Sequence, residues 1–186
     1  MAQFFEQLSP ELAGFIRKQP MFFVASAAAK GRVNLSPKGM NTLRVLDDKT
    51  VGYLDITGSG NETAAHALHD GRLTMMFCSF DDKPLILRLY GRSEVVPAGS
   101  GKFEELISKF ERFPGERQMI LLHIESLQTS CGFAVPRMKL IEHRETLADW
   151  AAKKGEAALC EYRDKKNAKS IDGLNTGLIS TSTPVG

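Results

Sequence analysis

The fold of this 186-residue chain is decided by residues 43–96, which read LRVLDDKTVGYLDITGSGNETAAHALHDGRLTMMFCSFDDKPLILRLYGRSEVV. Most of this stretch consists of four strand-like runs: 43–46, 50–56, 73–80 and 85–96. Only one short helix, 64–69, interrupts them, and Gly71 is placed to end it. Strands spaced this closely, with so little helix between them, favour an antiparallel barrel over a parallel sheet.

The flanking sequence extends this pattern in both directions. Ser9 can cap an opening helix that Pro20 ends. The remaining predicted elements are strands at 21–27, 33–36 and 119–127 and helices at 103–110, 146–154 and 156–166. Pro37-Lys38-Gly39 is expected to break the pairing of the second of these strands. We therefore expect a mainly β (α+β) domain over 1–143, a helical extension of the same domain over 144–174, and a flexible tail over 175–186, above all from Ile179 onward.

Composition excludes several classes of protein. Lys plus Arg is 24 and Asp plus Glu is 22, so the net charge of +2 gives no broad field for nucleic acid or a membrane surface. No apolar run reaches the roughly 20 residues of a membrane-spanning helix. The first residues lack the order of a signal peptide, so a cytoplasmic location is expected. Three cysteines and four dispersed histidines predict neither a disulfide framework nor a metal site.

The strongest functional signal is the polar, glycine-rich loop Thr57-Gly58-Ser59-Gly60-Asn61-Glu62-Thr63. Small residues let a ligand approach the backbone closely, and the first N–H groups of the helix that follows attract anions. The loop therefore has the properties of a phosphate cradle. An ordinary helix start, with Ser59 or Asn61 as its cap, explains the same residues equally well.

Four other places offer polar groups to a ligand. Arg44 lies on the strand before the one that enters the loop, so its guanidinium is expected beside the phosphate. Lys38, after Ser36, sits at a bend that can hold an ammonium over a ligand. Arg88 lies on the long strand 85–96, and Ser130 with Cys131 follows the last strand. Each of these also fits an ordinary surface or packing role, and no catalytic acid, base or nucleophile can be identified.

In order along the chain, these motifs resemble the pyridoxamine 5'-phosphate oxidase-related flavoproteins of split β-barrel fold. The resemblance rests on Asn34-Leu35-Ser36-Pro37-Lys38-Gly39, Leu43-Arg44-Val45-Leu46, the loop with Ala64-Ala65-His66, and Ile86-Leu87-Arg88-Leu89-Tyr90-Gly91-Arg92. Two later stretches, 128–136 and 166–174, are similar to one uncharacterised branch of that family. The resemblance implies an antiparallel split β-barrel with peripheral helices and a helical C-terminal extension.

The resemblance also implies a homodimer that holds FMN in two clefts at the subunit interface. Arg44, Val45 and Leu46 match the strand that runs beside the flavin and reaches its phosphate. Thr57, Ser59, Gly60, Asn61, Glu62 and Thr63 match the phosphate loop, and Ser36 and Lys38 would lie near the flavin ring. Lys38 or Arg88 would stabilise the reduced ring. Ser130 and Cys131 would reach a cofactor cleft, with that of the other subunit as one alternative.

Two departures from the family pattern narrow the expected function. Glu62 and Thr63 stand where pyridoxamine phosphate oxidases carry an Arg-Lys pair, and the C-terminal substrate signature of those enzymes is absent. We therefore expect an FMN-binding oxidoreductase acting on a small molecule other than pyridoxamine phosphate. The alternatives are a split barrel that binds a deazaflavin or haem, the latter through His66 or His143, and a flavin-binding module without turnover.

Overall fold

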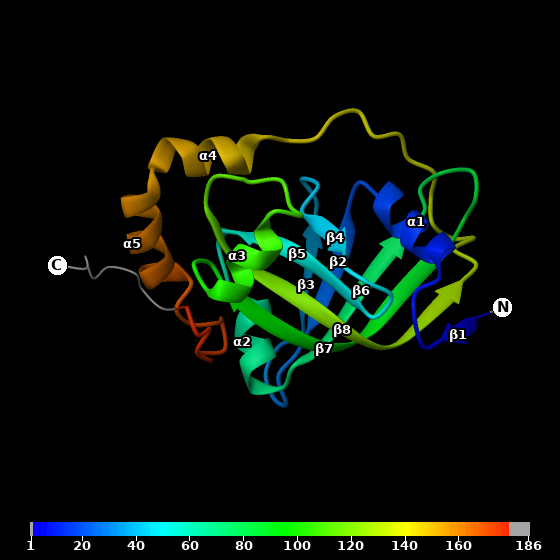
Figure 1. Cartoon of the computed structure of the whole chain (residues 1–186), viewed down its shortest axis with the longest axis horizontal. Coiled ribbons are helices and arrows are strands. Elements are labelled where there is room, and N and C mark those ends of the chain that lie inside the picture. The colour runs from blue at the N-terminus through cyan, green and yellow to red at the C-terminus, as the bar shows by residue number, and fades with distance from the viewer. Residues whose placement is uncertain (1, 179–186) are drawn as a thin grey trace.

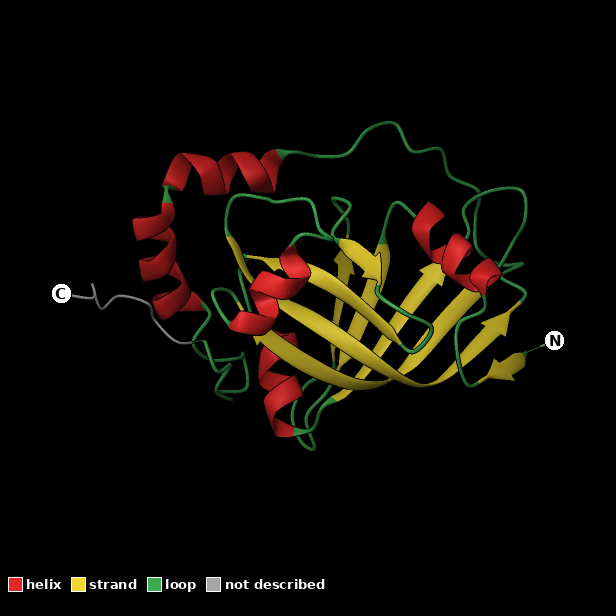
Figure 2. Cartoon of the chain, in the orientation of Figure 1, coloured by secondary structure: helices red, strands yellow, loops and turns green. Residues whose placement is uncertain are grey.

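The computed structural model describes residues 2–178 and folds them around one strongly curved antiparallel sheet (Figures 1 and 2). Over these residues the sheet has eight strands, in the order β3-β2-β6-β7-β8-β5-β4 with β1 paired to β8. The strands are β1 (Gln3–Phe5), β2 (Phe22–Ser26), β3 (Asn34–Lys38), β4 (Leu43–Val45), β5 (Thr50–Ile56), β6 (Arg72–Cys78), β7 (Ile86–Pro97) and β8 (Glu116–Ser130). The predicted split barrel with peripheral helices is confirmed, and β3 and β4 form the two ends of its sheet.

The helices surround this sheet (Figure 2). They are α1 (Pro10–Lys18), α2 (Glu62–His69), α3 (Gly101–Ile107), α4 (Thr146–Lys154) and α5 (Glu156–Lys166). Ser9 caps α1 as predicted, since its Oγ accepts a hydrogen bond from the N–H of Leu12 at 3.2 Å. A long segment without helix or strand carries the chain from β8 to α4 and α5, which stand at one side of the barrel (Figure 1). None of the helices within residues 2–178 combines the length and apolar character needed to cross a bilayer.

The end of the chain is described only in part. The predicted flexible tip, from Ile179 onward, lies outside the described residues. Within the first residues of the predicted tail, Thr176 is buried, and its Oγ1 donates to the carbonyl oxygen of Asn167 at 2.6 Å. This part of the predicted tail therefore packs against the segment that follows α5.

Two predicted strands run two or more residues beyond their expected ends. The pairing of β3 does not stop at Pro37, because Pro37 and Lys38 lie opposite Phe23 and Phe22 of β2. An edge strand such as β3 tolerates a proline, because only every second N–H group of such a strand takes part in the ladder. The strand predicted at 119–127 runs from Glu116 to Ser130, so the charged residues at its start belong to the sheet.

The core consists of two apolar clusters on the two faces of the curved sheet. Val51 and Tyr53 of β5 pack into the barrel interior together with Phe22, Phe77 and Leu89. Leu54 faces the other way, into a second cluster built largely around Phe103 and Phe110. Because side chains alternate along a strand, Asp55 follows Val51 and Tyr53 onto the interior face. A carboxylate is thus carried to the end of the barrel interior, where the candidate site lies.

Candidate functional site

A pocket of about 320 Å³ opens where the edge strand β3 meets the end of β5 and the start of α2. Ser36 and Lys38 line it from β3, Asp55 from β5, and Leu147 from α4. The glycine-rich loop lines it with residues 58–61, followed by the first two residues of α2. The pocket therefore lies in the gap between the edge strand β3 and the end of β5, which we call the split of the barrel. The loop predicted from the sequence forms one wall of this gap.

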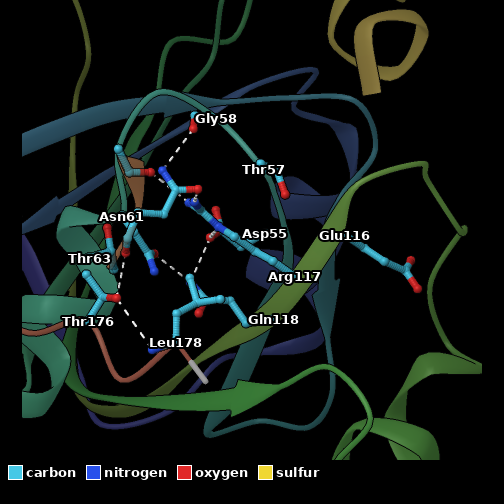
Figure 3. A network of polar contacts seen from close by, with 12 residues as sticks. Asp55, Thr57, Gly58, Asn61, Thr63, Glu116, Arg117, Gln118, Thr176 and Leu178 are labelled. Carbon is cyan, nitrogen blue, oxygen red and sulfur yellow. Dashed lines mark hydrogen bonds and ion pairs between the residues drawn. The ribbon is translucent and has the colours of Figure 1, made fainter. Parts of the chain in front are cut away.

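Asp55 is the centre of a buried polar network at the base of this pocket (Figure 3). Its Oδ2 accepts hydrogen bonds from Arg117 Nε and Gln118 Nε2, both at 2.8 Å. Its Oδ1 accepts one from Lys38 Nζ at 3.0 Å. Since Lys38 belongs to β3, this last ion pair bridges the split of the barrel.

A β-bulge explains how two successive residues of β8 reach the same carboxylate. Asp55 pairs with Gln118, but the next residue, Ile56, pairs with Glu116, so Arg117 is the extra residue of the bulge. Successive side chains of a regular strand point to opposite faces, and a bulge redirects one of them. The irregularity therefore places the guanidinium beside the amide of Gln118.

Asp55 remains ionised in this network. Burial alone would raise its pKa, but the positive charges of Arg117 and Lys38 outweigh burial and hold the pKa of Asp55 well below its ordinary value. The carboxylate and the guanidinium are both nearly inaccessible to water. Asp55 is thus a fixed negative charge that orients two cations rather than a proton donor.

Asn61 presents a buried donor with no partner among the described residues. Its Oδ1 accepts a hydrogen bond from Gln118 Nε2 at 2.8 Å, whereas its Nδ2 is buried and makes no hydrogen bond. Asn61 is the N-cap residue of α2, yet its side chain makes no capping hydrogen bond. A buried unpaired donor is unfavourable unless a ligand satisfies it, so this atom favours the phosphate-cradle interpretation over an ordinary helix cap.

The two loop glycines leave room for a ligand. Neither Gly58 nor Gly60 has a positive φ angle, so neither is required by the backbone conformation. A Cβ atom added at Gly58 would come no closer than 3.9 Å to any neighbour, and one at Gly60 no closer than 3.5 Å. Packing within the chain therefore does not explain these glycines, whereas close approach of a bound group would.

The structure brings together half of the predicted site residues. Those that line this pocket are Ser36, Lys38, Ser59, Gly60, Asn61, Glu62 and Thr63. Thr57 does not line it: the Thr57 hydroxyl is fully buried, donates to the carbonyl of Gly115 at 2.7 Å and accepts from Arg163 at 2.8 Å. Within one chain, Thr57 therefore supports the loop from behind.

Arg44 does not approach the loop within one chain, although β4 and β5 are neighbours as predicted. Arg44 pairs with Gly52, and residues paired across strands share a face of the sheet, so Arg44 lies on the face opposite Asp55. Its guanidinium donates to the carbonyl oxygens of Lys109 at 2.7 Å and Asn41 at 2.9 Å and lies 5.6 Å from the centre of the Phe110 ring. Val45 and Leu46 pack into the two core clusters.

Three more predicted residues lie at the other end of the sheet. Arg88 donates a hydrogen bond to Ser130 Oγ at 3.2 Å, and Cys131 follows exposed. Arg117 and Ser130 stand at opposite ends of β8, whose 15 residues span up to about 45 Å at about 3.3 Å per residue. One chain therefore separates this group from the pocket.

Sequence reasoning missed the centre of the network, namely Asp55, Arg117, Gln118 and Asn167. A signal existed for Asp55, because a carboxylate inside a run of buried strand residues requires a partner. For Arg117 the signal was hidden, since Glu116-Arg117-Gln118 reads as a polar turn before a strand. Asn167 lies in a C-terminal segment whose position on the loop no local pattern predicts.

Comparison with known proteins agrees with this fold. The family model described as pyridoxamine 5'-phosphate oxidase matches residues 8–131. The pyridoxamine 5'-phosphate oxidase family protein ustO of Aspergillus flavus is 37% identical over an alignment of 194 positions, which covers 94% of this chain and 77% of that protein.

Two solved structures share the fold at lower identity. A putative pyridoxamine 5'-phosphate oxidase from Lactobacillus delbrueckii is 19% identical with a TM-score of 0.54, covering 66% of this chain and 94% of that one. HupZ of Group A Streptococcus is 23% identical with a TM-score of 0.51, covering 64% of this chain and 91% of that one. With the family match over residues 8–131 and the ustO similarity over nearly the whole length, the chain belongs to the pyridoxamine 5'-phosphate oxidase family.

Proposed function

We propose that the protein is a flavin-dependent oxidoreductase that binds FMN with its phosphate in the pocket at the start of α2. The observation that carries this proposal is the buried, unpaired Nδ2 of Asn61, a residue that lines a pocket formed by a glycine-rich loop and a helix N-terminus. A phosphate oxygen is an acceptor of the right chemistry for such a donor. Membership of the pyridoxamine 5'-phosphate oxidase family supports a flavin as the group that carries the phosphate.

The pocket has equal numbers of positive and negative lining side chains, which limits the electrostatic attraction of a phosphate. Lys38 and Arg117 are balanced by Asp55 and Glu62, so the lining side chains carry no net charge. The two cations come from β3 and β8, whereas Glu62 and Thr63 occupy the positions of the Arg-Lys pair of pyridoxamine phosphate oxidases. Phosphate binding would therefore depend on N–H donors of the loop, on Asn61 and on Lys38 more than on net positive charge.

The predicted site residues outside this pocket would contact the flavin only if a second copy of the chain completes the site. Arg44, Val45 and Leu46 on one side, and Arg88, Ser130 and Cys131 at the far end of the sheet, would contact the flavin in clefts that a homodimer completes. A bound isoalloxazine ring supplies hydride or electron transfer, and the protein orients it and sets its polarity. Small-molecule substrates other than pyridoxamine phosphate are expected, because the C-terminal substrate signature of pyridoxamine phosphate oxidases is absent.

Absorbance of the purified protein tests the proposal directly. We expect the two visible bands of an oxidised flavin, or, for protein purified without cofactor, a rise in melting temperature on adding FMN. An intense Soret band would indicate haem instead, with His143 as the candidate ligand, since His66 is buried and its Nδ1 lies 3.0 Å from Ser26 Oγ. A colourless protein whose melting temperature does not respond to FMN would contradict FMN binding.

Replacing Asn61 with alanine is expected to weaken FMN binding by about tenfold, the size of one lost hydrogen bond to a charged acceptor. Riboflavin, which lacks the phosphate, should bind equally well to both proteins. The stability of α2 should change little, because the side chain of Asn61 makes no capping hydrogen bond and Gln118 keeps its bond to Asp55. Fluorescence titration with both flavins measures the effect, and equal FMN affinities would remove Asn61 from the site.

A further inference from the structure

The C-terminal segment folds back onto the glycine-rich loop, and the residues through which it does so, Arg163, Asn167 and Ile171, are not among those that line the pocket. Asn167, which follows α5 and is fully buried, donates from Nδ2 to the carbonyl oxygen of Gly58 at 3.1 Å. Its Oδ1 accepts from Arg117 Nη1 at 2.8 Å, and Arg117 Nη2 donates to the carbonyl oxygen of Gly60 at 2.9 Å. Asn167 therefore holds the loop both directly and through Arg117.

Two further contacts attach the same segment to either end of the loop. Arg163 of α5 donates from Nε to Thr57 Oγ1 at 2.8 Å, and its Nη2 donates to the carbonyl oxygen of Glu116 at 3.3 Å. The N–H of Ile171 donates to the carboxylate of Glu62 at 3.0 Å. The loop is thus held at its first residue, at two carbonyl groups and at the first residue of α2.

Holding the carbonyl groups determines where the loop N–H groups point. In a planar trans peptide the C=O and N–H bonds point in opposite directions, and the described residues contain no cis peptide. A carbonyl of Gly58 that faces Asn167 therefore turns the N–H of Ser59 away from Asn167. The carbonyl of Gly60 faces Arg117, so the N–H of Asn61 is turned away from Arg117. Ser59 and Asn61 both line the pocket.

The contact from Ile171 also acts on charge. Glu62 lines the pocket, and its carboxylate would repel a phosphate. Because both carboxylate oxygens lie within 3.2 Å of the N–H of Ile171, that charge is held toward the C-terminal turn. The turn is itself attached to the β2–β3 connection, where Asp172 accepts a hydrogen bond from the N–H of Arg32 at 2.7 Å.

We propose that Asn167 and Arg163 are positioning residues for the phosphate of the cofactor: they hold the loop in the conformation that presents its N–H groups to the pocket. The inference rests on the proposed function and adds to it, because both residues lie outside residues 8–131, which match the family model. The binding site is then built from two segments more than 100 residues apart in sequence.

Asn167→Asp tests this proposal with little change of shape. A carboxylate keeps the acceptor for Arg117 but cannot donate to the carbonyl of Gly58. We expect FMN affinity to fall about tenfold, riboflavin affinity to stay the same, and hydrogen–deuterium exchange over residues 57–62 of the flavin-free protein to accelerate. Asn175→Asp, the same change at an exposed residue of the same turn, should alter none of the three.

A second variant keeps the test decisive if Asn167→Asp does not fold. Arg163→Lys retains a positive charge opposite Glu156 but cannot span Thr57 and the Glu116 carbonyl together, so the same three changes are expected at smaller size. Equal losses of FMN and riboflavin affinity, or unchanged exchange over 57–62, would overturn the positioning role. If the wild-type protein binds neither flavin, the proposed function fails, while the exchange measurement still decides whether the C-terminal segment holds the loop.

Discussion

Replacing Asp55 with alanine is expected to lower the free energy of unfolding by about 3–5 kcal/mol, the range for breaking a buried ion pair from one side. Arg117 would be left nearly inaccessible to water without its counterion, and Lys38 would lose the partner that joins β3 to β5. Urea unfolding followed by circular dichroism measures the loss. A variant within about 1 kcal/mol of the wild type would show that the network does not hold the split of the barrel together.

A surface carboxylate provides the matched control. Asp82 also pairs with an arginine, Arg137, and both side chains are more than three-quarters exposed to solvent. Asp82→Ala is therefore expected to leave the urea midpoint almost unchanged, because solvent screens exposed ion pairs. The contrast between the two variants separates the effect of burial from that of the charge pair itself.

The lowered pKa of Asp55 makes the stability of the protein depend on pH. Because the pKa of Asp55 is lowered by folding, its stabilisation is fully present above the ordinary pKa of about 4 and is lost as the pH falls from there toward the folded pKa. In that window the unfolded chain binds a proton that the folded protein does not, so stability falls with decreasing pH. The stability difference between wild type and Asp55→Asn should therefore shrink below about pH 4.

Gly91→Ala is expected to be the second severe substitution, with a loss of about 3 kcal/mol or more. Tyr90 pairs with Ser126 but Gly91 pairs with Ile124, so β8 carries a bulge here. A Cβ atom on Gly91 would lie 1.9 Å from the carbonyl oxygen of His123, which is backbone and cannot move aside as a side chain would. The paired strands β7 and β8 would have to separate at this bulge.

Gly14→Ala is the control for this prediction. Gly14 lies inside α1, and a Cβ atom there would meet nothing within 4 Å. Since glycine destabilises a helix interior, this variant should gain about 0.5–1 kcal/mol. Thermal unfolding of both variants measures the pair, and a Gly91→Ala protein as stable as Gly14→Ala would refute the close approach of the two strands.

Local pattern predicts several elements to the residue. The bounds of β5, α4 and α5 are those expected from apolar alternation, helical spacing and Gly155 as the separator. The glycine-rich loop can be recognised because glycines and small polar residues stand together directly before a helix. These predictions succeed because strand alternation, helix capping and turn chemistry depend on residues within a few positions of each other.

Local pattern does not decide features that depend on residues distant in the sequence. Pro37 reads as a strand breaker, but an edge strand tolerates it, and edge position depends on the order of the whole sheet. Arg44 lies on the predicted neighbouring strand but on its other face, because register with Gly52 decides the face. The polar start of β8 lies outside the predicted strand because a bulge, not alternation, turns Arg117 inward.

By itself the sequence determined the antiparallel strand pattern, the loop at residues 57–63 and the family to which the chain belongs. Only the tertiary structure decided that Asp55 gathers Lys38, Arg117 and Gln118, and that Asn167 supports the loop from behind. The physical reason is range: hydrophobic periodicity and glycine conformations are local properties of the chain. A buried charge network instead depends on strand register and on contacts between segments up to about 110 residues apart, which exist only once the chain has folded.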